Sequence, residues 1–425
     1  MKTMIYRLQV VLLLFAAAAC KKDKGFVHDN NAPVVVDKFT PEKGGSGTEV
    51  LIYGTNFSTD TTGVTVTING VKALVTGIIS DHILVVIPEK AGTGKVVVSI
   101  NGKTGEAPKD FQYEASYKVS TLAGNGTAGF SDGKGSNVAF SFNKRCGLDV
   151  DADGNVYAAD AENFRVRKIA PDGTVTTLAG GMYGYQEGKG GDAQFYLPFD
   201  VVTDNSGNIF VSDPSAWTVR KITPDGTTSR IVWGEAWGLG IDKRNGTLYY
   251  ANNRYPGSIY QVTQDGTAAE IIKGLSGPAD VAVDDKGNLF VTENGNSIIK
   301  KFAAGSWEPT VIAGAENQTG LVNGVGTAAR FENPWGITLD AANNIYVAGN
   351  GSSDGSTVNS NQCIRLITAN NWNVTTYIGG GTAGFADGTG AAALFSAPTG
   401  VAVDKHGVVY VLDRNNNRIR KVIAE

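Results

Sequence analysis

Short apolar runs separated by polar, glycine-rich turns fill the chain from residue 117 to its end. One unit recurs six times: an apolar strand that ends in aspartate, a tight turn, and a second apolar strand that carries tyrosine or phenylalanine. The first strands of these units lie at 148–151, 201–204, 239–242, 281–284, 337–340 and 401–404. Their closing aspartates are 53, 38, 42, 56 and 64 residues apart, which brackets the length of a four-stranded propeller blade. The pattern predicts an all-β fold with a six-bladed β-propeller over 117–425.

The last repeat has no fourth strand of its own before Glu425. A matching strand stands at the other end of the repeat region, because residues 119–124 resemble the fourth strand of the first repeat at 175–180. We therefore expect this N-terminal strand to complete the sixth blade. Closing the ring in this way would remove an open sheet edge that invites aggregation.

Residues 32–115 also show short alternating runs, for example at 49–54, 64–70 and 96–102. Strands of five or six residues with a turn about every ten residues are typical of a β-sandwich. The run at 149–160 has the spacing of an EF-hand calcium loop, but no helices flank it. We interpret that run as the strand–turn–strand found in the other repeats.

Two family resemblances follow from these segments. Residues 400–422, which include GVAVD, VYVLD and RIRKV, resemble the NHL repeat. The segments YGTNF at 53–57, INGVKA at 68–73 and 88–103 resemble the IPT/TIG family. The first resemblance implies a propeller that most often binds proteins, although some six-bladed relatives are lyases or metal-dependent lactonases. The second implies an immunoglobulin-like spacer or contact domain without catalytic residues.

The first twenty residues have the features of an export signal. Lys2 and Arg7 precede a short apolar stretch, and small residues lead to Cys20. This arrangement resembles a bacterial lipobox, and the charged residues after Cys20 resemble export tags of Bacteroidetes surface lipoproteins. We expect a signal peptide at 1–19, a lipid anchor on Cys20, a tether at 20–31, an IPT/TIG-like domain at 32–115 and the propeller at 117–425. The predicted location is the outer membrane or cell surface.

Composition and charge exclude several classes of protein. The 55 glycines follow no collagen-like period, and a formal charge of −4 without a basic stripe argues against a nucleic-acid partner. The two cysteines of the repeat region, Cys146 and Cys363, fall in blades one and five. Because those blades are not neighbours, we expect no disulfide.

The candidate binding face carries the long loops that join the blades, at 124–141, 180–194, 314–330 and 380–394, and an expanded loop from 349 to about 362. Exposed aromatic side chains on that face would suit sugar rings or a partner's side chains. We predict that these residues rim the channel mouth or lie in the neighbouring loops. The predicted ligand contacts are Phe199, Trp237, Trp335, Trp217, Tyr255, Tyr183, Tyr185, Asn252 and Asn253.

Two other repeated features have a structural interpretation. The glycine-rich kernels of the long loops, such as 129–135 and 384–390, are expected to pack the blades, with Phe130 and Phe385 plugged between them. Polar residues that follow the second strands are expected to accept hydrogen bonds from the next loop or from a third-strand arginine. These residues are Asp160, Asp213, Asn252, Glu293 and Asp413.

The chain has three histidines, at 28, 82 and 406, and none lies where it could serve a propeller active site. It shows no nucleophile elbow, phosphate loop or zinc spacing. We predict a non-enzymatic surface protein that binds an extracellular ligand, most readily a glycan, and needs no cofactor or metal. A protein–protein scaffold is the main alternative, and a metal-dependent enzyme that uses Asp200, Asp280 or Glu293 is the second.

Overall fold

The computed structural model describes residues 28–263, 265–349 and 361–425. The predicted signal peptide and Cys20, the predicted site of acylation, lie outside the described residues, as does most of the expanded loop of blade five. The chain divides into two compact units, with the boundary after Ser116. Within the parts of the chain that are described, no helix is long and apolar enough to cross a bilayer.

The first unit is a sandwich of two β-sheets. One sheet has the order β1-β3-β7-β6 and the other β2-β9-β8-β4-β5. The strands are β1 Val35–Thr40, β2 Lys43–Gly44, β3 Glu49–Thr55, β4 Val64–Ile68, β5 Val71–Lys72, β6 Leu74–Ile79, β7 His82–Val86, β8 Gly94–Ile100 and β9 Lys103–Tyr113, with a 3₁₀ turn η1 at Thr61–Gly63. Alternate residues of these strands are buried, as in β4, where Val64, Val66 and Ile68 face the core. The predicted immunoglobulin-like sandwich is therefore confirmed.

The second unit is a propeller of six antiparallel sheets. In each blade the first strand contacts the first strand of the next blade, and β35 of blade six contacts β12 of blade one, so the ring is closed. Blade one contains β12 Leu148–Val150, β13 Val156–Asp160, β14 Arg165–Ile169 and β15 Thr174–Gly180. Blade two contains β17 Val201–Thr203, β18 Ile209–Asp213, β19 Thr218–Ile222 and β20 Thr227–Trp233. Blade three contains β21 Leu239–Asp242, β22 Thr247–Asn252, β23 Gly257–Val262 and β24 Ala268–Leu275. Blade four contains β25 Pro278–Val283, β26 Leu289–Glu293, β27 Ile298–Phe302 and β28 Pro309–Ala313. Blade five contains β30 Pro334–Leu339, β31 Ile345–Gly349, β32 Gln362–Ile367 and β33 Asn373–Gly381. Blade six contains β35 Pro398–Val403, β36 Val409–Asp413, β37 Arg418–Ala424 and β10 Tyr117–Ala123.

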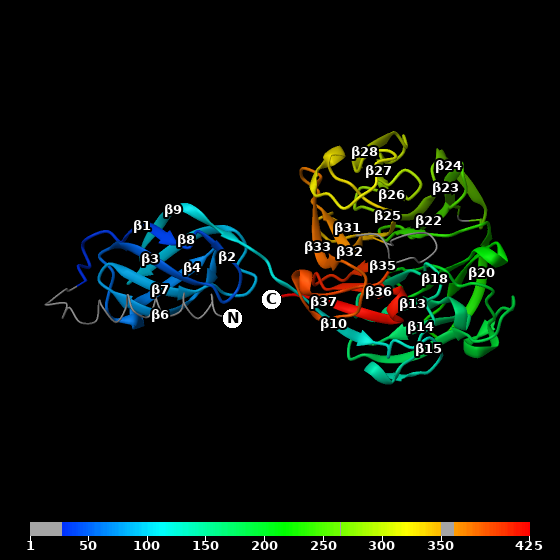
Figure 1. Cartoon of the computed structure of the whole chain (residues 1–425), viewed down its shortest axis with the longest axis horizontal. Helices are drawn as coiled ribbons and strands as arrows, with labels where there is room; N and C mark the ends of the chain where they lie inside the picture. Colours follow the sequence, from blue (N-terminus) through cyan, green and yellow to red (C-terminus); the bar gives the residue numbers. More distant parts are fainter. Residues whose placement is uncertain (1–27, 264, 350–360) are drawn as a thin grey trace. The chain divides into compact units, whose positions relative to one another are not determined.

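The N-terminal strand closes the ring as the sequence predicts. β10 pairs antiparallel with β37, with Val119 opposite Val422. Figure 1 shows these two strands side by side, β10 in cyan and β37 in red, although their residues lie about 300 positions apart in the chain. The last blade is therefore built from both ends of the repeat region.

Four blades carry a further two-residue strand at the outer edge, contributed by the long loop that precedes the blade. These strands are β11 Gly133–Lys134, β16 Gly188–Lys189, β29 Gly324–Val325 and β34 Gly388–Thr389. The remaining described elements are 3₁₀ turns: η2 Gly135–Asn137, η3 Ala161–Asn163, η4 Gly190–Asp192, η5 Pro214–Ala216, η6 Gly326–Ala328, η7 Gly390–Ala392 and η8 Arg414–Asn416. The kernels of the long loops thus cover the outer sheet edges of their blades.

The aspartate that ends each first strand builds the following turn. In five blades its carboxylate accepts the backbone N–H groups two and four residues later, as when Asp204 Oδ1 accepts from Ser206 and Asn208 at 2.8 Å. This Asx turn fixes the tight strand-to-strand connection. The calcium-like run at 149–160 is one such strand–turn–strand, from β12 to β13.

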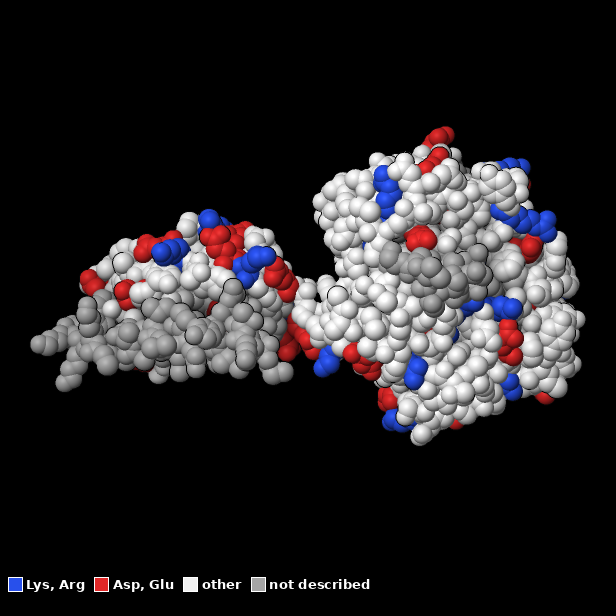
Figure 2. Space-filling model, in the orientation of Figure 1, with Lys and Arg blue, Asp and Glu red and all other residues white. Residues whose placement is uncertain are grey.

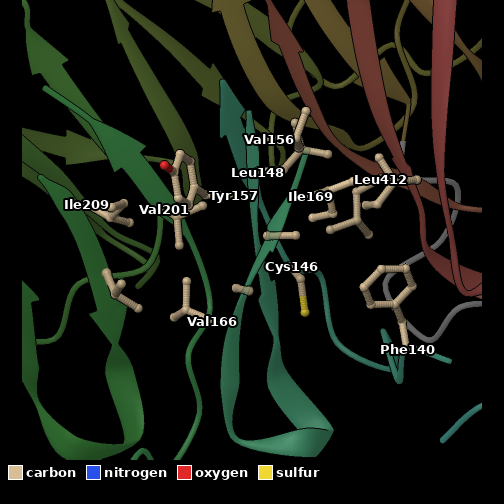
Figure 3. Packing of buried hydrophobic residues seen from close by; sticks show 14 of the residues in the cluster. Phe140, Cys146, Leu148, Val156, Tyr157, Val166, Ile169, Val201, Ile209 and Leu412 are labelled. Atoms are coloured by element: carbon tan, nitrogen blue, oxygen red, sulfur yellow. The ribbon is translucent and has the colours of Figure 1, made fainter. Parts of the chain in front are cut away.

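Packing between the blades forms the core. One cluster joins blades six, one and two, with Leu412, Leu148 and Val201 contributed by the three blades (Figure 3). Cys146 lies in this cluster, and both Cys146 and Cys363 are buried and unpaired, in agreement with the expected absence of a disulfide. Burial raises the pKa of the Cys146 thiol to about 12, so this thiol stays protonated and unreactive.

Candidate functional site

The long-loop face consists of the loops that join successive blades and the loops between second and third strands. A buried arginine in the third strand holds each long loop in place. Its guanidinium donates to loop carbonyls, as when Arg365 donates to the carbonyl oxygens of Arg330 and Val322 at 2.9 Å. The four blades with long loops have the fully buried side chains Arg167, Arg220, Arg365 and Arg420 at this position. Blades three and four, which follow short joins, have Tyr260 and Lys300 there.

The kernel phenylalanines do not plug between the blades, contrary to the prediction. Phe130 and Phe385 are each 46% exposed. The guanidinium carbon of Arg165 lies 3.7 Å from the ring centroid of Phe130, and that of Arg418 lies 3.7 Å from the ring centroid of Phe385. Phenylalanines at or just after the ends of the long loops are fully buried instead: Phe140, Phe195, Phe331 and Phe395. The general interpretation of the kernel as a packing device is confirmed, but its apolar anchors are these later residues.

The polar residues after the second strands have the structural role that the sequence predicts. Asp413 accepts the backbone N–H of Ser396 at 2.8 Å and pairs with Arg420 at 2.6 Å. Asp160 pairs in the same way with Arg167 at 2.7 Å. Glu293 accepts the N–H of Ser276 and pairs with Lys300. These carboxylates hold loops to blades.

The aromatic residues at the channel mouth form a plug, which corrects the prediction of an exposed rim. Phe199 is 3% exposed and Trp335 is 4% exposed, and both pack with Ala279. The centroid of the Phe199 ring lies 4.8 Å from the ring centroid of Trp237 and 6.3 Å from that of Trp335, and both pairs have an edge-to-face arrangement. Phe199, Trp237 and Trp335 come from equivalent positions of blades two, three and five, and their large side chains pack against one another at the axis of the propeller. Trp237 is partly buried against them.

A channel of about 1020 Å³ lies below this plug. Its lining extends from Phe199, Trp335 and Thr399 down to the first-to-second-strand turns, so the channel opens on the face opposite the long loops. The lining includes eleven aspartates and four basic side chains, which disfavours anionic ligands there. The ligand-accessible end of the channel is therefore not the end predicted from the sequence.

Asp200 and Asp280 meet inside this channel. They hold equivalent positions in blades two and four, and their side chains are hydrogen-bonded to each other. Asp200 Oδ2 accepts a hydrogen bond from the N–H of Leu239 at 2.7 Å, and Asp280 Oδ2 accepts one from the N–H of Ile337 at 2.9 Å. Each carboxyl group is therefore also hydrogen-bonded to the next blade. Burial raises the pKa of Asp200 to about 7, and burial together with the charge of Asp200 raises the pKa of Asp280 well above its ordinary value.

Glycine at the equivalent position of blade one leaves room for this pair. A Cβ atom on Gly147 would lie 1.7 Å from Asp200 Oδ1. Glu293, the third candidate for a metal-dependent reaction, is bound to Ser276 and Lys300 and is not part of the pair. Across residues 28–263, 265–349 and 361–425, no three histidine, cysteine, aspartate or glutamate side chains are grouped so that they could hold a metal ion.

Exposed aromatic residues do occur elsewhere on the long-loop face, over blades two and three. Trp217 is 55% exposed and Tyr255 is 85% exposed. Arg254 connects them, because its guanidinium lies 5.4 Å from the Trp217 ring centroid and it precedes Tyr255 in the chain. Arg254 also pairs with Glu235 in the short join between the two blades. We call Trp217, Glu235, Arg254 and Tyr255 the aromatic shelf.

The other predicted contacts differ in availability. Tyr183 is 66% exposed and lies edge-on to Tyr196 at 4.9 Å, whereas Tyr185 is partly buried and stacks on Trp233. Asn253 donates to the carbonyl oxygen of Pro278, so it has a structural partner, and Asn252 is partly buried at the end of β22.

Sequence reasoning missed Arg254 and Glu235. Arg254 is next to Tyr255 in the chain and Glu235 is close to Trp237, but this proximity does not show that the two side chains form an ion pair.

In the view of Figure 2, charged side chains on the propeller are scattered among uncharged surface, and no continuous basic band is visible.

Comparison with known proteins supports the two-part architecture. The family model of the IPT/TIG domain matches residues 33–113, and that of the NHL repeat matches residues 275–302 and 395–422. NHL repeat-containing protein 2 of Bos taurus is 28% identical over 308 residues, which cover 67% of this chain and 39% of that protein. Protein SUPPRESSOR OF QUENCHING 1, chloroplastic, of Arabidopsis thaliana is 27% identical over 315 residues, which cover 71% of this chain and 27% of that protein. The chain thus spans about two fifths or less of the length of these relatives.

Two solved structures share the fold. An auxiliary nutrient binding protein from Bacteroides ovatus ATCC 8483 has a TM-score of 0.60 and 23% identity, with 94% of this chain and all of that chain covered. A protein of the same description from Bacteroides thetaiotaomicron VPI-5482 has a TM-score of 0.59 and 22% identity, with 93% and 99% covered. The chain accordingly consists of an IPT/TIG domain followed by a β-propeller that contains NHL repeats.

Proposed function

We propose that this protein is a lipid-anchored cell-surface protein that binds an extracellular glycan on the aromatic shelf. The observation that carries the proposal is the exposure of Trp217 and Tyr255 on the long-loop face of a rigid propeller. Aromatic rings in such positions offer flat apolar platforms on which sugar rings stack. The described fold resembles that of proteins called auxiliary nutrient binding proteins, which agrees with a binding role.

The backbone of Trp217 is held in one conformation. Trp217 has φ 55° at the end of η5, and its carbonyl oxygen accepts the N–H of Gly234 at 2.8 Å. A bulky residue adopts this left-handed conformation only when the surrounding structure requires it. The backbone that carries the exposed indole is therefore already ordered before a ligand binds, which lowers the entropic cost of binding.

Polar groups beside the rings supply the hydrogen bonds that a sugar needs. Arg254 carries a guanidinium with several donors, and Glu235 carries a carboxylate that can accept from hydroxyl groups. Because the two side chains already pair with each other, their geometry is fixed before a ligand arrives. The shelf thus combines stacking surface with oriented donors and acceptors.

A glycan array tests the proposal directly. The fragment comprising residues 28–425 is screened, and binding of any hit is measured by calorimetry. The double variant Trp217→Ala/Tyr255→Ala should lose at least tenfold in affinity, which corresponds to about 1.4 kcal/mol. Phe385→Ala, which removes a half-exposed aromatic ring from the loop that precedes blade six, is the matched control and should bind as the unaltered protein does.

The proposal is wrong if the array shows no hit, or if a confirmed glycan binds the double variant with unchanged affinity. Circular dichroism of each variant separates a loss of binding from a loss of folding.

A further inference from the structure

The outer edges of blades one and two share one arrangement. In both, the turn before the fourth strand reads Asp-Gly-Thr, at 172–174 and 225–227. A Gly-Lys strand from the preceding long loop then pairs with the fourth strand, β11 with β15 and β16 with β20. We call the Asp-Gly-Thr turn together with the next residue along the chain, Val175 or Thr228, the fifth-strand seat.

Two kinds of contact hold the Gly-Lys strand in an occupied seat. The lysine pairs with the aspartate of the turn, at 2.7 Å for Lys134 and Asp172 and at 2.9 Å for Lys189 and Asp225. The glycine after the lysine donates its N–H to the carbonyl oxygen of the turn glycine at 3.0 Å in both blades. As a result, the turn glycines Gly173 and Gly226 are buried.

Blade three has the same seat, and no strand among the described residues occupies it. Its turn is again Asp-Gly-Thr, at 265–267, and Gly266 has φ 80°, compared with 83° and 86° for Gly173 and Gly226. In the described part of the chain this sheet has four strands, because the join that precedes blade three, residues 234–238, is too short to reach the outer edge.

The exposure of the seat in blade three reflects this vacancy. Gly266 and Ala268 are partly exposed, whereas the equivalent residues of blades one and two are buried. Asp265 is exposed, and within the described part of the chain no lysine or arginine pairs with it. Among the described residues, no backbone N–H donates to the carbonyl oxygen of Gly266.

Blade four is not equivalent. Its turn, residues 303–308, contains no Asp-Gly-Thr, and its fourth strand begins with Pro309, which has no N–H to donate. The vacancy is thus a specific property of blade three.

We propose that the fifth-strand seat of blade three binds an extended, Gly-Lys-containing segment of a partner protein by β-strand addition. Main-chain hydrogen bonds to an open edge give such complexes their affinity, and alternate side chains set their register. The lysine would pair with Asp265, as Lys134 and Lys189 pair with the aspartates of blades one and two. Because an exposed ion pair contributes little to affinity, the lysine mainly selects the register of the added strand. This site is independent of the aromatic shelf.

A peptide taken from the chain itself is the appropriate probe. A fluorescently labelled peptide with the sequence of residues 184–195, which contains Gly188-Lys189-Gly190, is titrated with the full chain and followed by anisotropy. We expect saturable binding, a several-fold loss with Asp265→Lys, and a similar loss with a peptide that carries Lys189→Glu. Combining the altered protein with the altered peptide should restore binding, because the charges are exchanged.

Controls distinguish the seat from nonspecific attraction. Asp172→Lys introduces the same charge change at an occupied seat and should leave peptide binding unchanged. Hydrogen exchange should show new protection at Ala268 and its neighbours when the peptide is bound. Absence of saturable binding, equal binding to Asp265→Lys, or protection confined to another blade would each overturn the proposal. None of these results bears on glycan binding by Trp217.

Discussion

Asp200 and Asp280 occupy the same position in blades two and four, and their carboxyl groups share a hydrogen bond within the channel. Each also accepts a backbone N–H from the following blade, that of Leu239 or Ile337. Asp200 is buried and Asp280 is partly buried, and two such carboxyl groups in contact cannot both ionise without strong repulsion, so the pair retains a proton near neutral pH. Asp200 thus links blade two to blade three and Asp280 links blade four to blade five, and the retained proton relieves the repulsion between the two carboxyl groups.

The pair makes stability depend on pH. The pKa of Asp200 is about 7 in the folded protein and close to the ordinary value of 3.8 in the unfolded chain. The folded state therefore binds more protons between these values, and stability falls as pH rises through this range. Urea unfolding from pH 4 to pH 8 measures this loss.

Variants of the pair isolate its contribution. Asp280→Asn removes one titrating carboxyl group, so the stability of this variant should fall less steeply with pH than that of the unaltered protein. Asp413, whose pKa burial raises to about 6, adds a slope of the same sign to both proteins and cancels in the comparison. Parallel stability curves for the two proteins would contradict the shared proton.

The aromatic plug predicts that large channel residues stabilise the fold and do not contact a ligand on the long-loop face. Trp335→Ala and Phe199→Ala each remove a buried ring, and such changes cost roughly 3–5 kcal/mol. Chemical denaturation should show this loss, whereas Trp217→Ala should leave stability nearly unchanged. A Trp335→Ala protein that unfolds at the original denaturant concentration would show that the plug contributes no packing.

The third-strand arginines predict a large cost for losing one guanidinium. Arg420→Met leaves the buried carboxylate of Asp413 without its cation and leaves loop carbonyls without their donor. Removing one partner of a buried pair costs about 3–5 kcal/mol. The neighbouring Lys421→Met is the matched control and should change the free energy of unfolding by less than about 1 kcal/mol. Equal effects of the two substitutions would refute the role of Arg420.

The proposed lipid anchor on Cys20 predicts a change in location when this residue is replaced. Acyl chains on this residue would hold the protein at a membrane by about 0.8 kcal/mol for each buried CH₂ group. Cys20→Ala should therefore shift the protein from the membrane fraction to the soluble fraction, or leave its precursor unprocessed. Fractionation followed by mass measurement of the N-terminal peptide checks this, and an unchanged membrane fraction would rule out acylation at Cys20.

Periodicity along the chain determined the architecture. The alternation within strands, the Asp-turn-strand unit and the match between residues 119–124 and 175–180 together predicted the sandwich, the six blades and the closure of the ring by β10. These features are local or repeated, so each can be recognised without knowing which distant residues meet. The role of the aspartates after the second strands was predictable for the same reason, since it recurs in blades one, two and six.

Only the tertiary structure decided where the side chains at the channel mouth point. A residue such as Trp335 at the start of a first strand lies on a rim if its counterparts are small and in a plug if they are large. Phe199 and Trp237 come from other blades, so the outcome depends on packing between segments far apart in sequence. The contact of Asp200 with Asp280 and the vacant seat beside Gly266 have the same origin. The contact depends on how the ring brings the blades together, and the vacant seat depends on the length of the join before blade three. The pattern of apolar residues predicts neither.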